Sequence, residues 1–185
     1  WCFFAHINLT STEPRQRGKA QPLDALIKTP SGWMTMGDAK VGDWVSTPDG
    51  SRARITQLHP QGVKDVYKIF LKDGLTAECC LDHLWKIRFD DGIVRIADLR
   101  EILTYLRNDE YIGTIAIPVL MSDGREQYVD IDSIVHSRST QAQCITIDHP
   151  EHLYITNDNI ITHNSIAAVA ICCYVLYIAG CNMEI

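Results

Sequence analysis

Tight-turn signals at short intervals constrain the fold of this chain more than any other feature. Four of them are TPDG (47–50), KDG (72–74), DDG (90–92) and SDG (122–124). Glycine supplies the positive φ that such turns need, so each signal marks a reversal of the chain. The runs between them have strand length and are rich in β-branched and aromatic residues, as in VYKIFL (66–71) and HLWKIRF (83–89). The pattern predicts an all-β body.

One helix is expected inside this body. The run ADLREILTYLR (97–107) places four apolar residues, Leu99, Ile102, Leu103 and Leu106, on one helical face. Strand-like runs follow it, namely IGTIAIPVL (112–120), QCITI (143–147) and HLYIT (152–156). With 46% hydrophobic residues in a length of 185, the chain can bury the core of one domain.

Charge and cysteine content exclude several classes of protein. The 17 Lys and Arg residues against 23 Asp and Glu residues give a net charge of −6, and no basic stripe suited to nucleic acid occurs. Seven cysteines include the adjacent pairs Cys79-Cys80 and Cys172-Cys173 but no CxxC spacing. We therefore expect no disulfide framework, no metal site and a reducing, cytoplasmic location.

Neither end of the chain has the pattern of a membrane segment. The opening WCFFAHINL lacks the basic region and the cleavage site of a signal peptide. The uncharged run 166–180 has 15 residues, whereas a transmembrane helix needs about 20. We expect a buried helix there and no membrane partner.

The two flanks of the β body form part of a known sequence motif when they are joined. Deleting residues 20–164 brings Gly18 and Lys19 next to Ser165, which gives the GK[ST] end of a phosphate-binding loop followed by an apolar helix. In such a loop the Lys reaches phosphate oxygens and the hydroxyl binds Mg²⁺. Glu13 stands where the first glycine of the loop would be. The pattern indicates a domain inserted into another protein's sequence.

An Asn followed by a hydroxyl residue ends this insertion. His163 precedes Asn164, and Ser165 follows it. The Asn side-chain nitrogen can attack its own backbone carbonyl through a five-membered ring and cleave the chain after itself, while a neighbouring His moves protons. Intramolecular attack of this kind reaches effective molarities of about 10⁵–10⁸ M when well oriented. Taken alone, this tripeptide is also typical of ordinary loops, so self-cleavage here is one of two interpretations until further motifs are considered.

Several sequence blocks in the insertion resemble those of inteins, the self-splicing proteins of the Hint fold. The blocks are PLDALIKTPSG (22–32), GDAKVGDWV (37–45), TAECCLDHLW (76–85) and CITIDHPEHLYITNDNIITHNS (144–165). The resemblance implies an all-β, horseshoe-shaped fold and a mini-intein at 20–164, since the gap between the second and third blocks is too short for a homing endonuclease. The flanks 1–19 and 165–185 are then the upstream and downstream extein segments.

The first residue of the insertion departs from the usual intein pattern. Inteins usually begin with Cys or Ser, but Ala20 has only a methyl group and cannot act as a nucleophile. In class 3 inteins the nucleophile is instead a Cys in the late block, accompanied by a Trp and a Thr. Trp85, Cys144 and Thr162 match those three positions. A second departure is Cys80, which stands where inteins usually carry Thr three residues before the block His.

The resemblance implies a role for each site residue. Cys144 attacks the Lys19 carbonyl and takes the upstream segment as a thioester, and His83 protonates the leaving nitrogen of Ala20. Ser165 then receives the acyl group as an ester. Asn164 cyclises with help from His163 and His152, and a final O-to-N shift joins Lys19 to Ser165. Trp85 and Thr162 complete the expected site, which needs no cofactor because every step exchanges one acyl bond for another.

Three other interpretations remain open at this point. The chain could be an ordinary class 1 intein trapped by an engineered Cys-to-Ala change at position 20. It could be a P-loop ATPase fragment with an insertion that does not splice, but no Walker B acid follows the loop. It could be a Hint domain that only cleaves, although Ser165 provides an acceptor for the acyl group.

The flanks also suggest the host and the mode of action. The joined RQxGK-S segment resembles the Walker loop of phage large terminase subunits, the DNA-packaging ATPases. We expect the inserted domain to act in cis on its own flanks, once per molecule rather than as a multiple-turnover enzyme. We expect a monomer that needs no nucleic acid.

Overall fold

A computed structural model describes residues 19–108 and 111–163 of the chain. These residues form strands and one α-helix, in agreement with the predicted all-β body. The elements are β1 (Gln21–Pro22), β2 (Leu26–Thr29), β3 (Gly32–Thr35), β4 (Trp44–Ser46), β5 (Arg52–Leu71), β6 (Thr76–Cys80), β7 (Leu84–Phe89), β8 (Val94–Asp98), α1 (Leu99–Leu106), β9 (Ile115–Leu120), β10 (Glu126–Ile147), β11 (Leu153–Ile155), a 3₁₀ turn η1 (Asn157–Asn159) and β12 (Ile161–His163).

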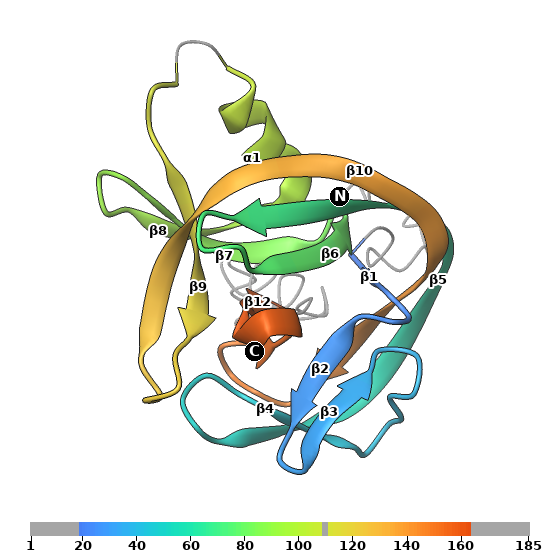
Figure 1. The fold of residues 1–185 in the computed structure, drawn as a ribbon. Helices are drawn as coiled ribbons and strands as arrows, with labels where there is room; N and C mark the ends of the chain where they lie inside the picture. Colours follow the sequence, from blue (N-terminus) through green and yellow to red (C-terminus); the bar gives the residue numbers. More distant parts are fainter. Residues whose placement is uncertain (1–18, 109–110, 164–185) are drawn as a thin grey trace, which may run out of the picture.

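Two long antiparallel strands, β5 and β10, organise the fold. They pair from Leu71 opposite Ile131 to Ile55 opposite Ile147, with four shifts of register along the way. Within the described residues the main sheet has the order β4-β5-β10-β9-β7-β8, while β1 pairs with β10 and β6 pairs with β5. In Figure 1, β10 arches around the molecule, and β1 and β12 lie inside that curve. The architecture is the predicted horseshoe, with both ends of the described chain inside it.

The length of β5 and β10 is the main difference from the sequence prediction. The expected strand at 66–71 is only the last part of β5, and the expected strand at 143–147 is only the end of β10. The middle of each long strand is mostly exposed, so it lacks the alternation of apolar and polar residues that identifies a strand in sequence. The two middles pair with each other instead of covering a core.

The predicted helix is present as α1. The Asp98 carboxylate caps it by accepting a hydrogen bond of 2.8 Å from the backbone N–H of Glu101. Leu99, Ile102 and Leu103 are buried as expected, whereas Leu106 at the end of the helix is 37% exposed. With eight residues, α1 is too short to cross a membrane, and the described part of the chain contains no helix that could. The apolar run 166–180 lies outside the described residues.

The core is divided between the two ends of the long β5–β10 ladder. One cluster packs β7, β9 and α1 together around Trp85, Ile87 and Ile117. The other packs the hairpin β2–β3 against the opposite end of the ladder around Ile27, Met36 and Ile145. A third, small cluster of Ala20, Cys80 and Ala142 lies where β1 meets β6 and β10. The ladder therefore carries both halves of the molecule and leaves the first residue of the insertion between them.

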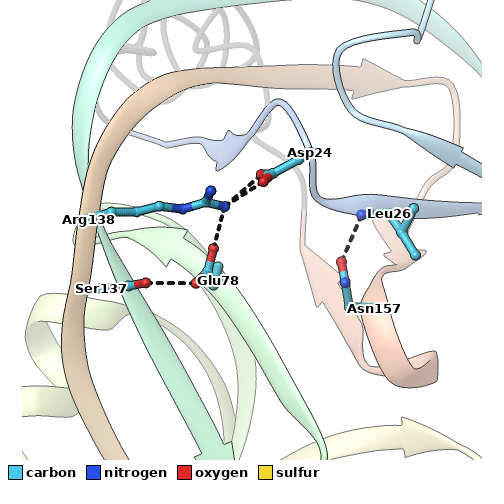
Figure 2. Close-up of polar contacts among 6 residues, drawn as sticks. All are labelled: Asp24, Leu26, Glu78, Ser137, Arg138 and Asn157. Carbon is cyan, nitrogen blue, oxygen red and sulfur yellow. Dashed lines mark hydrogen bonds and ion pairs between the residues drawn. The ribbon is translucent and has the colours of Figure 1, made fainter.

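A group of charged side chains fixes the segment that follows β1. Figure 2 shows the Arg138 guanidinium between two carboxylates, with distances of 2.7 Å to Asp24 Oδ2 and 2.8 Å to Glu78 Oε2. Ser137 donates a hydrogen bond of 2.8 Å to the other oxygen of Glu78. Because Arg138 belongs to β10 and Glu78 to β6, this group joins three segments that are far apart in sequence.

The bulge at Gly62 gives a test of how the long ladder is built. The register passes from Pro60 opposite Gln143 to Gly62 opposite Ala142, so the ladder is irregular where β1 joins β10. Gly62 has a φ of +69° and open space around its missing Cβ. We expect Gly62→Ala to lower the free energy of unfolding by about 1–2 kcal/mol through left-handed backbone strain alone. Urea unfolding measures this loss.

The matched control for this prediction is Gly62→Asn at the same position. Asn tolerates the left-handed conformation better than Ala, so it should lose clearly less stability. Equal losses for the Ala and Asn variants would show that steric crowding, and not the backbone conformation, decides the effect.

Candidate functional site at the two ends of the insertion

The register between β1 and β10 places Ala20 next to Cys144. Gln21 pairs with Gln143 and Pro22 with Ala142, so the antiparallel ladder continued by one residue sets Ala20 opposite Cys144. Ala20 is completely buried, and Cys144 is 5% exposed. The thiol predicted as nucleophile thus comes from the strand that borders the upstream junction.

Cys80 contacts Ala20 from the other side, at the end of β6. The backbone N–H of Ala20 lies 2.9 Å from Cys80 Sγ, and the thiol lies 3.1 Å from Ala20 O. The backbone N–H of Cys80 also donates to Ala20 O over 3.0 Å. Ala20 N is the nitrogen of the Lys19–Ala20 peptide bond. Cys80 therefore makes direct polar contacts with the residue at the junction, in the place where inteins usually carry Thr.

Burial keeps the Cys80 thiol protonated. It raises the pKa of Cys80 to about 11, against smaller opposing effects of the backbone hydrogen bonds at Ala20 and Asp82. The neighbouring Cys144 raises this pKa as well. A neutral thiol has a proton to donate and sulfur lone pairs to accept with, which fits the two contacts with Ala20.

His83 is held by a tight turn and by the start of α1. Its backbone N–H donates to Cys80 O over 3.1 Å, and its carbonyl accepts from Leu99 N over 3.1 Å. The side chain is 2% exposed and packs edge-on against Trp85, with ring centroids 5.2 Å apart. The first residue of α1 therefore helps to fix the loop that carries His83.

Thr162 links His83 to the last described strand. His83 Nε2 lies 2.6 Å from Thr162 Oγ1, and the Thr162 hydroxyl donates to Leu84 O over 3.3 Å. Since that hydroxyl has a single proton, we assign the His83 ring proton to Nε2 and leave Nδ1 as the acceptor. Nδ1 is buried without a hydrogen-bond partner in the described part of the chain.

The His83 ring is uncharged at neutral pH. Desolvation by burial, followed by the charges of His163 and Lys19, lowers the pKa of His83 to about 3. The same effects show that His163 and Lys19 lie close enough to influence this ring. His163 on β12 and Lys19, the first described residue, thus both contribute to the electrostatic environment of the His83 ring.

The hairpin β11–β12 carries the predicted downstream residues. Leu153 pairs with His163 and Tyr154 with Thr162. His163 is 7% exposed, and its ring centroid lies 6.0 Å from that of His152, which has a left-handed backbone with φ of 54°. Asn164, Ser165 and Gly18 lie outside the described residues.

Most of the predicted site residues therefore lie together, and sequence reasoning missed several others. The structure brings Ala20, Cys144, His83, Trp85, Thr162 and His163 into one buried region, with His152 beside His163. The missed residues are Cys80, whose position before His83 was the available signal, and Gln21, Tyr154 and Thr156, which had none. Within 19–108 and 111–163, no group of three or more His, Cys, Asp or Glu side chains could hold a metal ion.

Comparison with solved structures identifies the fold as the Hint fold of inteins. The chain is 28% identical to the Msm DnaB1 intein splicing domain bound with zinc, with a TM-score of 0.57 that covers 78% of this chain and 100% of that one. It is 25% identical to the MchDnaB-1 intein, with a TM-score of 0.57 and the same two coverages. A DnaB intein from Synechocystis sp. PCC 6803 is 20% identical, with a TM-score of 0.60 over 80% of this chain and 99% of that one.

Curated proteins give a likeness to part of a longer protein. The replicative DNA helicase DnaB of Mycobacterium leprae (strain TN) is 29% identical over 154 residues, which are 80% of this chain and 24% of that protein. The DnaB helicase of Mycobacterium intracellulare is 33% identical over 69 residues, 37% of this chain and 12% of that protein. The chain thus spans a quarter or less of these relatives, and no protein-family model matches it. Together with the fold, these likenesses support a mini-intein.

The lowered pKa of His83 predicts how stability depends on pH. Between pH 6.5 and about pH 3 the unfolded chain binds a proton at His83 that the folded chain does not. The free energy of unfolding should therefore fall as the pH falls through this window, by at most about 1.4 kcal/mol per pH unit from this one group. His83→Gln should flatten that acid limb in urea unfolding series.

The control for this series is His136→Gln. The His136 side chain is 52% exposed and lies 3.6 Å from the Asp65 carboxylate, and solvent screens an exposed pair of this kind. Its removal should therefore change the acid limb much less than removal of the buried His83. Both variants are best measured with Cys144→Ala and Asn164→Ala in place, so that cleavage does not interfere. An acid limb that stays the same in His83→Gln would contradict the assignment of a buried, neutral His83.

Proposed function

We propose that this chain is a self-splicing precursor in which residues 20–164 excise themselves and join Lys19 to Ser165. Support for splicing comes from the fold shared with solved inteins and from the effects of both Lys19 and His163 on the pKa of His83. The observation that carries the particular mechanism is the β1–β10 register, which sets Cys144 opposite an alanine that has no nucleophilic atom.

The first step is a class 3 attack by Cys144. Its sulfur attacks the Lys19 carbonyl carbon, the Lys19–Ala20 bond breaks, and the thiol proton passes to the leaving nitrogen of Ala20. The upstream segment is then a thioester on Cys144. Reaction requires a sulfur-to-carbon approach of about 3–3.5 Å.

On this proposal, His83 carries the proton in the first step. A neutral ring with its proton on Nε2 can accept the thiol proton at Nδ1 and pass it to the Ala20 nitrogen. Thr162 fixes the ring through the 2.6 Å contact with Nε2. Trp85 packs against the same ring and excludes water from it. These contacts give Trp85 and Thr162 positioning roles.

The downstream steps complete the reaction. Ser165 takes the acyl group from Cys144 as an ester, and the Asn164 carboxamide nitrogen attacks its own carbonyl to release the insertion. On this proposal His163 and His152, whose ring centroids lie 6.0 Å apart, move protons in that step. The final O-to-N shift forms the Lys19–Ser165 peptide bond. Each step exchanges one acyl bond for another and consumes no cofactor.

We further propose that the flanks 1–19 and 165–185 belong to a terminase-like P-loop ATPase. The support is the joined Gly18-Lys19-Ser165 sequence, which would complete a phosphate-binding loop only after splicing. The precursor should accordingly be unable to hydrolyse ATP. On this proposal the insertion acts in cis as a monomer in a reducing cytoplasm.

Replacement of Cys144 tests the first step. We expect Cys144→Ala to abolish both splicing and thiol-induced release of the upstream 19 residues. The variant has no cysteine on β10 and so has lost the proposed nucleophile. Asn-driven cleavage before Ser165 should persist. Mass spectrometry of the full chain after incubation with dithiothreitol distinguishes the products, since splicing gives a 145-residue body and a 40-residue ligated peptide.

Position 20 separates this mechanism from that of a trapped class 1 intein. On the proposal, the chain splices with Ala20 as it is. If the chain never releases its upstream segment but Ala20→Cys switches splicing on, the class 3 assignment is wrong and the alternative of an engineered block is correct.

Replacement of Asn164 tests the last cleavage. Asn164→Ala should block release of residues 165–185, because alanine has no carboxamide to cyclise. Thioester formation at Cys144 should continue, so hydroxylamine should still release the upstream segment. Unchanged downstream cleavage in this variant would exclude the cyclisation mechanism.

A further inference from the structure

Both polar atoms of the Gln21 side-chain amide are hydrogen-bonded to residues of the distant C-terminal region. Tyr154 donates its hydroxyl proton to Gln21 Oε1 over 2.7 Å. The Gln21 Nε2 group donates to Thr156 Oγ1 over 3.0 Å, and that hydroxyl donates to Leu26 O over 2.9 Å. Tyr154 donates to Gln21, Gln21 donates to Thr156, and Thr156 donates to Leu26. This order fixes the orientation of the Gln21 amide, because its oxygen must face Tyr154 and its nitrogen Thr156.

This chain of hydrogen bonds is buried throughout. Gln21 is 1% exposed, Tyr154 2% and Thr156 0%. Burial also raises the pKa of the Tyr154 phenol well above its usual value, so the hydroxyl keeps the proton that it donates. A buried polar group that loses its partner costs the full desolvation penalty, which makes such a network specific for one arrangement of the backbone.

Two neighbouring contacts fix the same backbone segment. Figure 2 shows Asn157 Oδ1 accepting a hydrogen bond from Leu26 N over 2.7 Å. Both polar backbone groups of Leu26 are thus held by the consecutive residues Thr156 and Asn157. The segment from Gln21 to Leu26 is therefore attached to the chain between β11 and β12.

We infer that Gln21, Tyr154 and Thr156 are positioning residues that hold Ala20 against Cys144 for the upstream cleavage. The inference rests on the proposed splicing function and adds a role that neither the sequence nor the family resemblance assigned. Gln21 adjoins Ala20 and pairs with Gln143, next to Cys144 on β10. A fixed Gln21 side chain limits the movement of both atoms that must react, the Lys19 carbonyl carbon and the Cys144 sulfur.

The same geometry predicts that the network matters less for the downstream cleavage. The β11–β12 hairpin has its own pairing, with Leu153 opposite His163 and Tyr154 opposite Thr162. These backbone hydrogen bonds do not involve the Gln21 amide. Loss of the network should therefore separate the rates of the two cleavages, whereas a general loss of folding would lower both by the same factor.

Two isosteric variants remove single hydroxyl groups from the network. Both variants keep the side-chain shape. Tyr154→Phe removes the hydrogen bond to Gln21 Oε1, and Thr156→Val removes those to Gln21 Nε2 and Leu26 O. In the full chain with Asn164→Ala, we expect each variant to slow dithiothreitol-induced release of residues 1–19 about tenfold. In the full chain with Cys144→Ala, cleavage before Ser165 should change by less than about threefold. Both rates are followed by mass spectrometry.

Two further variants serve as controls. Thr156→Ser retains the hydroxyl and should restore upstream release to within about threefold of the parent rate. Tyr105→Phe removes a hydroxyl from the distant aromatic cluster with Phe89 and Tyr111 and should leave both rates unchanged.

The outcomes distinguish this inference from the proposed function. A parent chain that releases no upstream segment with thiol overturns the proposed function and this inference with it. A parent that releases the segment, with Tyr154→Phe and Thr156→Val at the same rate, overturns the inference alone. Equal slowing of both cleavages, or failure of Thr156→Ser to recover, also overturns it, because the network would then be merely structural.

Discussion

The antiparallel ladder between β5 and β10 is the constraint on which the rest of the structure depends. The two larger core clusters are built on the two ends of this ladder. Strand β1 pairs with β10 at Gln143 and Ala142, and β6 pairs with β5 over Val66–Phe70. Because the strands are 20 and 22 residues long and irregular in register, the ladder can curve and bring its two borders close together. The first residue of the insertion lies between those borders and is completely buried.

Burial at this point has chemical consequences. Away from water, His83 is uncharged and the Cys80 thiol keeps its proton, so both groups act as neutral hydrogen-bonding partners. Two thiols come from the strands next to Ala20, Cys80 on β6 and Cys144 on β10, but their relations to Ala20 differ. Cys80 makes hydrogen bonds with Ala20 itself, whereas Cys144 stands at the adjoining ladder position. This difference agrees with the proposal, in which Cys144 is the nucleophile and Cys80 has a positioning role.

Much of the fold followed from local patterns in the sequence. The turn signals, the strand at 84–89 and the capped helix after Asp98 are encoded within a few residues of where they occur, and the structure confirms them. The full length of β5 and β10 was not predictable, because their exposed middles pair with each other and leave no periodic pattern. The site residues Trp85, Cys144 and Thr162 were found through a family resemblance, which carries information that the local physics of the chain does not.

The sequence by itself determined which reactive groups the chain possesses: an alanine at the upstream junction, a cysteine in a late strand, and an Asn before a hydroxyl at the downstream junction. Only the tertiary structure decided which residues surround these groups. The contacts of Ala20 with Cys80, of His83 with Thr162 and of Gln21 with Tyr154 join positions separated by 60, 79 and 133 residues. Contacts at such separations depend on the register and curvature of the long ladder. The residues next to each contact in sequence do not determine either property.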